Sequence, residues 1–592
     1  MKKRSEIDKK YKWDFNDYFT SQKDFDDCYQ SCLSNLKKFE NYNGKLTSKK
    51  NILQLFLLLE KTTEQLESLY IYANCQKDVD VTDCINQARY EKILNLLTEQ
   101  EVSCSFVEPQ LSKLTSEQLN DMLQDKDFSN YTKIIRDVLK NKSHILDEDS
   151  EKLLSMMTSF CDNFSQNHTN FLDGDLKYKK VKDGKGKLRV MSNSMASIYL
   201  NSPDRVLRQN TYKELKGALG RYNNFFTSNY LGEVKKEVFL AKARKYKNSL
   251  ECALDSDEIP VSVYHNLILN VEKNLSLEHR YFDIKKRHLK LNDFSLADVY
   301  YNPTKAKNKY PYSEATEIVC KALGLLGKDY VAHIKHIIQN NMIDVYPSEN
   351  KIFGGYQIMA TKKTPRILLN YTDEYEDVST LAHELGHAMH SVYSDSAQST
   401  SNSKYPIFLA EIASTVNELL LNDYMISHSK NNDEKLLYVS EALSNFHSTI
   451  FRQTMFADFE MKIHNKVEQN EELSSSVLNE TYLELVKKYF GDEVDIIPEV
   501  KYEWSGIPHF YNDFYVYQYA TGKISAINIV ENLKTGKISV QDYKYFLSAG
   551  GTQPPIELLK TVHVDLNKEE PFELSFDYLK TKLNEYENLT SK

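Results

Sequence analysis

Before residue 200 the chain carries a single proline, Pro109, and this scarcity favours long, unbroken helices. Extended stretches of this part repeat apolar residues with the 3.6-residue period of an amphipathic helix, and residues 48–76 are one example. The apolar stripe of that stretch is expected to include Leu53, Leu57, Leu58 and Leu66. We therefore expect a helical lobe over residues 1–200.

Two segments depart from the helical pattern. Residues 176–195 indicate two short strands joined by a turn that contains glycine, and a helix is expected to follow with Ser202 as its N-cap. A small sheet is expected within residues 350–371, where a glycine pair precedes two short strands. These changes place a boundary near residue 200, so a second, mainly α domain is expected to cover residues 201–592.

The composition argues for a globular protein that binds neither nucleic acid nor membrane. Of the 592 residues, 41% are hydrophobic and 27% are charged, and the net charge of −9 comes without a basic block. The N-terminus is charged, and the most apolar run, residues 52–59, is too short to span a bilayer. We expect a soluble cytoplasmic protein that is a monomer or a small homo-oligomer.

Cysteine usage is typical of a reducing compartment. The eight cysteines form no Cys-x-x-Cys pair, and a chain of 592 residues needs no disulfides to build a core. Cys28 and Cys32 are four residues apart on an expected helix, but no matching histidine or cysteine pair accompanies them. Reduced and mostly inert thiols are therefore expected.

Residues 380–391, "TLAHELGHAMHS", indicate a metal site. His383 and His387 are four residues apart, so on a helix they project from one face and can converge on one zinc ion. Glu384 can act as general base toward a water whose pKa the zinc lowers to about 7. We expect one zinc ion per chain.

The neighbouring residues argue against a solvated helix face that only happens to hold histidine and glutamate. Buried histidine and glutamate side chains need partners, and a metal satisfies them together. Gly386 in mid-helix costs about 1 kcal/mol relative to alanine, and the close approach of another helix is the expected reason. The apolar residues that predict burial of this helix on most sides are Leu381, Ala382, Leu385, Ala388 and Met389.

Two residues compete to be the third protein ligand that a catalytic zinc needs. His390 is seven residues from His383, about 10.5 Å along a straight helix, which is too far for a shared ion. We expect it instead beside the site or toward substrate. Glu411 lies in a second expected helix, residues 406–421, among apolar neighbours, so it is preferred as ligand over a plain rim carboxylate. Glu418 either orients a ligand or is purely structural.

The combination of motifs resembles oligoendopeptidase F, of the thimet oligopeptidase superfamily. "LAHELGH" is followed, 24 residues after its second histidine, by the glutamate of "FLAEIAS". The other similar stretches are "KYKWDF" near the start, "PRILLNY" before the helix, "GIPHFYNDFYVYQYATG" at 506–522 and "SAGGTQPP" at 548–555. The likeness therefore spans nearly the whole chain.

The resemblance implies a mainly α, two-lobed helical bowl that encloses a deep channel, with a small β-sheet beside the zinc-binding helix. It implies hydrolysis of internal bonds in short unstructured peptides, with folded proteins excluded by the narrow entrance. The matching positions carry over as His383, His387 and Glu411 for zinc and Glu384 for catalysis.

In the wider family, a histidine and one or two tyrosines from the C-terminal part stabilise the transition state. His509 matches the histidine, and an O–H or N–H donor placed there would stabilise the developing oxyanion by a few kcal/mol. Tyr511, Tyr515 and Tyr519 are spaced by four residues, so one helical face could present them. Tyr511 and Tyr515 are candidates for catalysis and Tyr519 for substrate binding, although any of them could equally pack in a core.

A glycine-containing strand is the candidate for holding substrate backbone. Gly354, Gly355 and Tyr356 are expected on a strand edge that pairs with an extended peptide. Both the residue pattern of this segment and the family likeness favour this role.

Three other functions are compatible with part of the same sequence pattern. A zinc aminopeptidase would need a group for the free amine of its substrate, and no acidic motif upstream of His383 offers one. A dipeptidyl carboxypeptidase of the same superfamily would need cationic groups for a terminal carboxylate, which product analysis would test. A catalytically silent peptide-binding scaffold is disfavoured because Glu384 and both histidines are intact.

Overall fold

The structure is a computed structural model that describes residues 2–147, 150, 153–154, 157, 161, 163–303 and 308–591. Its elements gather into two compact units, each assembled from three separate segments of the chain. The first unit comprises Met1–Ile145, Lys307–Tyr424 and Ile529–Val564, and the second comprises Leu146–Ala306, Met425–Asn528 and Asp565–Lys592. The expected division near residue 200 stays a prediction.

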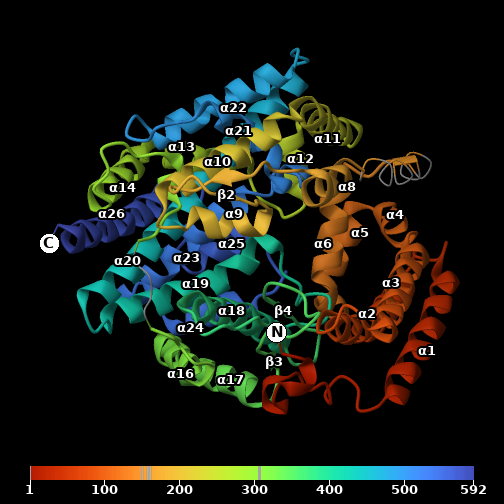
Figure 1. The fold of residues 1–592 in the computed structure, drawn as a ribbon. Helices are drawn as coiled ribbons and strands as arrows, with labels where there is room; N and C mark the ends of the chain where they lie inside the picture. The colour runs from red at the N-terminus through yellow and green to blue at the C-terminus, as the bar shows by residue number, and fades with distance from the viewer. Residues whose placement is uncertain are drawn as a thin grey trace. The chain divides into compact units, whose positions relative to one another are not determined.

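The mainly α class is confirmed, because nearly all regular structure in both units is helical (Figure 1). The helices that begin in the first unit are α1 (Gln22–Phe39), α2 (Lys49–Asp78), α3 (Cys84–Cys104), α4 (Val107–Ser112), α5 (Ser116–Leu123), α6 (Thr132–Asn141), α16 (Tyr312–Ala322), α17 (Lys328–Gln339), α18 (Tyr375–Ala397), α19 (Ile407–Ser427), α24 (Val540–Ser548) and α25 (Pro555–Lys560).

Helix α2 shows how the apolar period selects a buried face. Phe56 is 0% exposed and Leu66 is 1% exposed, whereas Leu57 is 53% exposed. The prediction is wrong at Leu57, which lies about 100° around the helix from Phe56 and so points away from the core. Leu53 and Leu58 pack at the margin of that core, as expected.

A three-stranded sheet in the first unit supports helix α18. Strand β3 (Ile343–Asp344) pairs in parallel with β5 (Arg366–Leu368), and β4 (Tyr356–Ile358) pairs antiparallel with the other side of β5. β5 is therefore central and buried, whereas β4 is an edge strand. The sheet expected within residues 350–371 is confirmed. β3 is missing from the prediction because a two-residue strand carries no period.

Acidic side chains cap the N-terminus of helix α18, which is the positive end of the helix dipole. Glu374 and Asp377 form a capping box, in which the Glu374 N–H donates to Asp377 Oδ2 at 3.0 Å. The helix lies against β4 (Figure 1) and also contacts β5. The helix expected after the small sheet, and the second helix expected over 406–421, are both confirmed as α18 and α19.

Among the described residues of the second unit, β1 (Val181–Lys182) and β2 (Leu188–Arg189) form a two-stranded sheet. Among its described residues, the helices that begin in this unit are α8 (Asn163–Asn170), α9 (Asn193–Leu200), α10 (Arg205–Gly220), α11 (Asn223–Ala243), α12 (Ser249–Asp255), α13 (Val261–Lys273), α14 (Leu275–His288), α15 (Leu296–Val299), α20 (Asn432–Phe446), α21 (Arg452–Glu468), α22 (Ser475–Phe490), α23 (Tyr517–Thr535) and α26 (Glu570–Thr590).

The hairpin expected over residues 176–195 is confirmed as the antiparallel pair β1–β2. The start of α10 differs from the prediction, because its N-cap is Asp204, whose Oδ1 accepts the Leu207 N–H at 3.2 Å. Ser202 instead accepts the N–H of Asp204 at 3.2 Å. Aspartate is as good an N-cap as serine, and its charge also favours the positive end of a helix.

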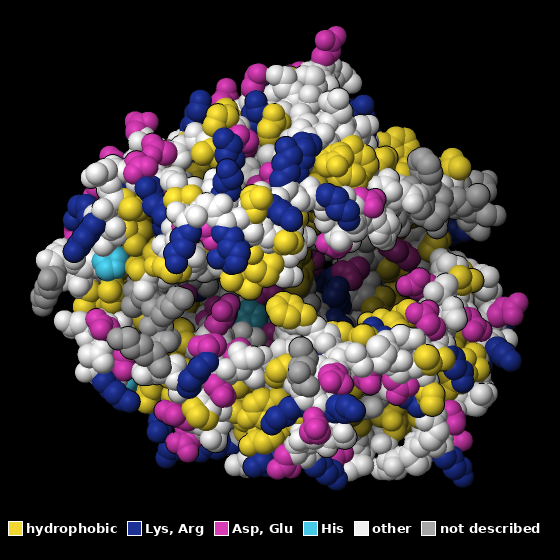
Figure 2. Space-filling model, viewed as in Figure 1, with side chains coloured by type: hydrophobic (Ala, Val, Ile, Leu, Met, Phe, Trp, Pro, Cys, Tyr) yellow, Lys and Arg dark blue, Asp and Glu magenta, His cyan; other side chains and the backbone are white. Residues whose placement is uncertain are grey.

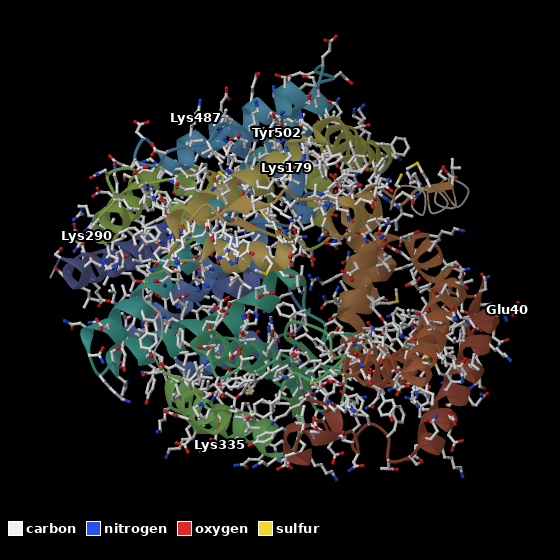
Figure 3. The ribbon with its side chains drawn as sticks, viewed as in Figure 1. Glu40, Lys179, Lys290, Lys335, Lys487 and Tyr502 are labelled. Atoms are coloured by element: carbon white, nitrogen blue, oxygen red, sulfur yellow. The ribbon has the colours of Figure 1, made fainter. Side chains whose placement is uncertain are left out.

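Charged side chains of both signs are interspersed on the visible face (Figure 2). Figure 3 shows Lys335 of α17 and Glu40, just after α1, directed away from the ribbon. Among the described residues, no helix is both long and apolar enough to cross a membrane. The eight cysteines are free thiols, as expected, and burial raises the pKa of Cys32 to about 12.

Candidate metal centre

Three side chains from two helices converge at one point of the first unit. His383 and His387 come from α18 and Glu411 comes from α19. His383 Nε2 lies 3.1 Å from His387 Nε2 and 3.6 Å from Glu411 Oε2. His387 Nε2 lies 3.8 Å from the same carboxylate oxygen. In the part of the chain that the structure describes, this is the one group of three or more His, Cys, Asp or Glu side chains whose ligand atoms lie within 4.8 Å of one another.

These separations fit a zinc ion. With bonds of about 2.0–2.1 Å in a tetrahedral arrangement, two ligand atoms lie about 3.3 Å apart. Two imidazole nitrogens and a carboxylate oxygen also form a donor set that catalytic zinc uses, with the fourth position open for water. The structure therefore brings together the three residues expected to bind zinc. Their role as ligands stays a prediction.

Gly386 allows α19 to approach α18 closely. A Cβ atom at this position would lie 2.5 Å from Ser414 Cα, far inside normal contact distance. Asn417 of α19 also donates its side-chain amide to the Ala382 carbonyl at 3.0 Å. The expected approach of another helix is confirmed, and it brings Glu411 to the two histidines.

The carboxylate of Glu418 orients the first histidine. His383 Nδ1 lies 2.7 Å from Glu418 Oε1, so Nδ1 carries a proton and donates it. That tautomer leaves the Nε2 lone pair of a neutral ring directed toward the other two ligands. His387 forms a hydrogen bond with the backbone of Ala410. Of the two roles left open for Glu418, its position supports the orienting one.

Three carboxylates surround the two imidazoles of this site. Burial alone would lower the pKa of His383, but the hydrogen bond and charge of Glu418 outweigh it and raise this pKa to about 9. Burial and the charge of His383 lower the pKa of His387 to about 3. The surplus of negative charge favours a cation at the point that the ligands share.

Glu384 follows His383 on α18 and is 6% exposed. Burial raises its pKa to about 7, against the opposing charge of His383. A carboxyl group with a pKa near neutrality is suited to take up and return a proton. A Cβ atom at Gly355 would lie 3.7 Å from Glu384 Oε1, so the carboxyl group faces the start of the edge strand.

His390 is packed in the core and does not face substrate. It is 0% exposed, and its ring stacks on Tyr405 with the centroids 3.6 Å apart. Neither ring nitrogen has a hydrogen-bond partner among the described residues, and burial lowers the pKa of this imidazole to about 3. Of the two places expected for His390, the one toward substrate is wrong because the ring is fully buried, whereas its interaction with the charge of His387 agrees with a place beside the site.

Of the three residues expected to bind substrate backbone, Tyr356 begins the edge strand β4, and Gly354 and Gly355 directly precede it. Gly354 has a φ of +94°, which favours glycine, and a Cβ atom at Gly355 would lie 3.2 Å from Thr380 Cγ2 of α18. The Tyr356 side chain turns to α2, where its hydroxyl donates to Asp78 Oδ2 at 2.9 Å. The expected place on an edge strand is confirmed for Tyr356 alone, because Gly354 and Gly355 lie just before β4, and contact with substrate stays a prediction.

In the second unit, His509, Tyr515 and Tyr519 form a group that we call the aromatic cluster. His509 Nε2 lies 3.2 Å from the Tyr519 hydroxyl oxygen. The ring of Tyr515 lies 6.0 Å from that of His509 and 5.4 Å from that of Tyr519. Burial lowers the pKa of His509. The cluster therefore offers uncharged O–H and N–H groups.

Tyr511 lies apart from the aromatic cluster. Its ring centroid is 4.4 Å from that of His168, and its hydroxyl accepts the Asn229 side-chain amide at 3.0 Å. The expected single helical face is wrong, because α23 begins only at Tyr517 and residues 512–516 form a loop. Of the three tyrosines, only Tyr515 and Tyr519 accompany His509.

Two polar residues further along α18 are not among the site residues predicted from the sequence. Ser391 and Asp395 continue the four-residue spacing of His383 and His387, in a row that turns slowly around the helix, and both line one cavity. Asp395 accepts two hydrogen bonds from the Lys362 backbone N–H, each at 3.0 Å. The repeat of polar residues at every fourth position is the signal that could have identified them.

Two family descriptions match the chain, Oligopeptidase F over residues 110–178 and Peptidase family M3 over residues 198–578. The chain is 34% identical to Oligopeptidase PepF of Bacillus subtilis (strain 168), across 100% of this chain and 88% of that protein. It is 30% identical to an Oligoendopeptidase F homolog of Lactococcus lactis subsp. lactis (strain IL1403), across 100% of this chain and 99% of that protein.

Solved structures show the same relationship. A crystal structure of a peptidase from Chlamydophila abortus matches with a TM-score of 0.91 and 32% identity, covering 99% of this chain and 100% of that one. Oligoendopeptidase-F from Enterococcus faecium matches with a TM-score of 0.74 and 28% identity, covering 96% of this chain and 99% of that one. The resemblance to oligoendopeptidase F is confirmed. The chain therefore belongs to peptidase family M3, the family of oligoendopeptidase F, and it is a peptidase.

Proposed function

We propose that the protein is a zinc-dependent endopeptidase of the cytoplasm that hydrolyses internal bonds of short unstructured peptides, with Glu384 as general base. The observation that carries this proposal is the convergence of His383, His387 and Glu411 beside a buried glutamate. The names of relatives, among them an oligopeptidase and an oligoendopeptidase, support the substrate class.

A zinc ion held by the three ligands would supply Lewis acidity for the attacking water and for the peptide carbonyl. Glu384, buried next to His383, takes the proton from that water and passes it to the leaving nitrogen. Glu418 fixes the tautomer and ring plane of His383. Peptide backbone is bound along the free edge of β4, where Gly355 lies next to Glu384.

The aromatic cluster has the donors that an oxyanion needs. In this proposal His509 and the tyrosines Tyr515 and Tyr519 donate hydrogen bonds to the negative charge that develops on the carbonyl oxygen. Their neutral N–H and O–H groups support this role. Tyr511 is a weaker candidate because its hydroxyl already bonds with Asn229.

A length series of one peptide sequence tests the endopeptidase proposal. Zinc content is measured on protein purified without chelator, and cleavage is followed by mass spectrometry with free and with blocked termini. We expect about one zinc per chain, cleavage of short blocked peptides and no digestion of denatured casein, because the family resemblance implies an enclosed channel. Strict dependence on a free carboxyl end would replace the proposal with a dipeptidyl carboxypeptidase. Zinc-free protein that gains no activity on adding zinc would contradict it.

A further inference from the structure

Helix α18 carries a polar stripe that continues beyond the metal ligands. The stripe comprises His383, His387, Ser391 and Asp395, which are each four residues apart, so the row turns by about 40° around the helix at every step. Eight residues separate His387 from Asp395, which is about 12 Å along the helix axis. An extended peptide covers that distance in about three to four residues.

The segment from the edge strand runs beside this stripe in the same direction. At its start, a Cβ atom at Gly355 would lie 3.7 Å from Glu384 Oε1. At its end, the Lys362 N–H bonds to both carboxylate oxygens of Asp395 at 3.0 Å. A peptide that pairs with β4 beside Glu384 therefore points along α18 toward Asp395.

A cavity of about 130 Å³ lies at the far end of this path. Cavities of about 150 Å³ accept a molecule the size of benzene, so this one has room for a single side chain. Ser391 Oγ lies 3.0 Å from the Tyr405 hydroxyl across the lining. The lining includes Met359, Thr361, Ser391, Asp395, Lys404 and Tyr405.

The charges around this cavity do not cancel. Lys404 Nζ is paired with Glu67 Oε1 at 2.7 Å, and Glu67 Oε2 accepts the Thr361 N–H at 2.9 Å. Lys362 extends its ammonium group to Glu64 rather than to Asp395. Burial raises the pKa of Asp395, against the charges of Lys404 and Lys362, but neither ammonium group lies within 4.0 Å of the Asp395 carboxylate. A cation entering the cavity would therefore be stabilised by a half-buried carboxylate.

We propose that this cavity is a substrate subsite for a cationic group, in which Asp395 binds the side chain of a lysine or arginine about three to four residues from the scissile bond. The proposal rests on the peptidase function proposed above. A free amino terminus at the same distance carries the same ammonium chemistry and is the other possible source of the cation.

Asp395 also has a structural role, which a variant used to test the subsite must preserve. It caps the backbone at Lys362, whose φ is +62°. Asparagine keeps one oxygen to accept that N–H while removing the charge, so Asp395→Asn separates recognition from folding. Glu317→Gln is the matched control, since it removes one carboxylate from an exposed position on α16.

The experiment is a lysine scan with the zinc-loaded enzyme. Neutral peptides with blocked ends carry one lysine at each of four positions on either side of a single cleaved bond, and norleucine replaces lysine in the reference series. We expect kcat/KM to rise about tenfold for lysine over norleucine at one position, as one charge-assisted contact implies. Asp395→Asn should remove this ratio, and Glu317→Gln should keep it.

Two additional experiments distinguish a lysine side chain from a free amino terminus and provide a second variant of the cavity. A peptide with a free amino end at the favoured distance, compared with its acetylated form, shows whether a terminus serves in place of a side chain. Ser391→Lys, which places an ammonium group in the cavity, should also abolish the preference and covers the case in which Asp395→Asn does not fold. A scan without a favoured position, or a preference unchanged in both variants, would overturn the subsite. Failure of the wild-type enzyme to cleave any peptide would instead overturn the proposed function.

Discussion

The metal centre of the first unit and the aromatic cluster of the second are built from different kinds of structure. The metal centre takes His383 and His387 from one regular helix and Glu411 from the next. The aromatic cluster takes His509 from a short 3₁₀ helix, η9 (Pro508–Tyr511), Tyr515 from a loop and Tyr519 from the first turn of α23.

This difference explains why only the metal centre can be predicted from the spacing of residues in the sequence. Side chains four residues apart on a helix keep a constant relation, whereas the course of a loop depends on its tertiary anchors. In the loop before α23, Phe514 has a φ of +50° and donates its N–H to the buried carboxylate of Glu460 at 2.9 Å. Such a backbone conformation costs on the order of 1–3 kcal/mol unless surrounding contacts hold it. Substitutions in the two sites should therefore have separable effects on metal and on turnover.

The largest effect is expected from Glu411→Ala. Removing one of three protein ligands should abolish stable zinc binding and, with it, peptide cleavage. Metal analysis after gel filtration and a cleavage assay measure the two losses. His390→Leu changes a histidine that stacks in the core, so it should keep zinc. If the two variants exchanged these outcomes, the choice of third ligand would be wrong.

Glu384→Gln should leave the metal centre intact and stop the chemistry. Zinc content and peptide affinity are expected to stay near wild type, while kcat falls by roughly 10²–10⁴ because the proton acceptor is lost. Single-turnover kinetics and peptide binding by calorimetry distinguish the two quantities. Turnover close to that of the wild type would remove Glu384 from the mechanism.

The aromatic cluster should affect turnover without affecting zinc. His509→Ala and Tyr519→Phe are expected to lower kcat, by roughly 10²-fold for a lost oxyanion donor, with a smaller change in KM. Tyr511→Phe is the control, since its hydroxyl bonds to Asn229 outside the cluster. Loss of zinc in the cluster variants, or a larger loss of kcat in Tyr511→Phe, would contradict the assignment.

The smallest effect concerns the contact between the two metal-binding helices. Gly386→Ala would push a Cβ atom against Ser414 and should destabilise the fold by about 1–3 kcal/mol. Gly324→Ala, in the 3₁₀ helix η6 (Leu323–Leu326), adds a Cβ atom that meets nothing within 4 Å and should be neutral or stabilising. Thermal unfolding of both variants makes the comparison. Equal stability would show that α19 can move away from α18.

The interior of α18 shows how far sequence reasoning reaches. Its period predicts the burial of the helix and the convergence of His383 and His387, and Gly386 predicts the approach of a second helix. The same pattern does not separate His390 from the site residues, because only the packing of Tyr405 against its ring reveals that it is enclosed. The sequence pattern also does not predict that Asp395 lines a cavity, because this depends on the segment at Lys362 that packs beside it.

The sequence by itself determined the helical class, the metal-binding motif and the family, because these depend on periodicity and on local spacing. Tertiary structure decided that α19 brings Glu411 and Glu418 to the histidines, that β4 is an edge strand beside Glu384, and that Tyr511 lies apart from Tyr515. These relations join residues that are distant in the chain or lie across a loop. Local propensity does not encode such distances, since they are set by the packing of whole elements against one another.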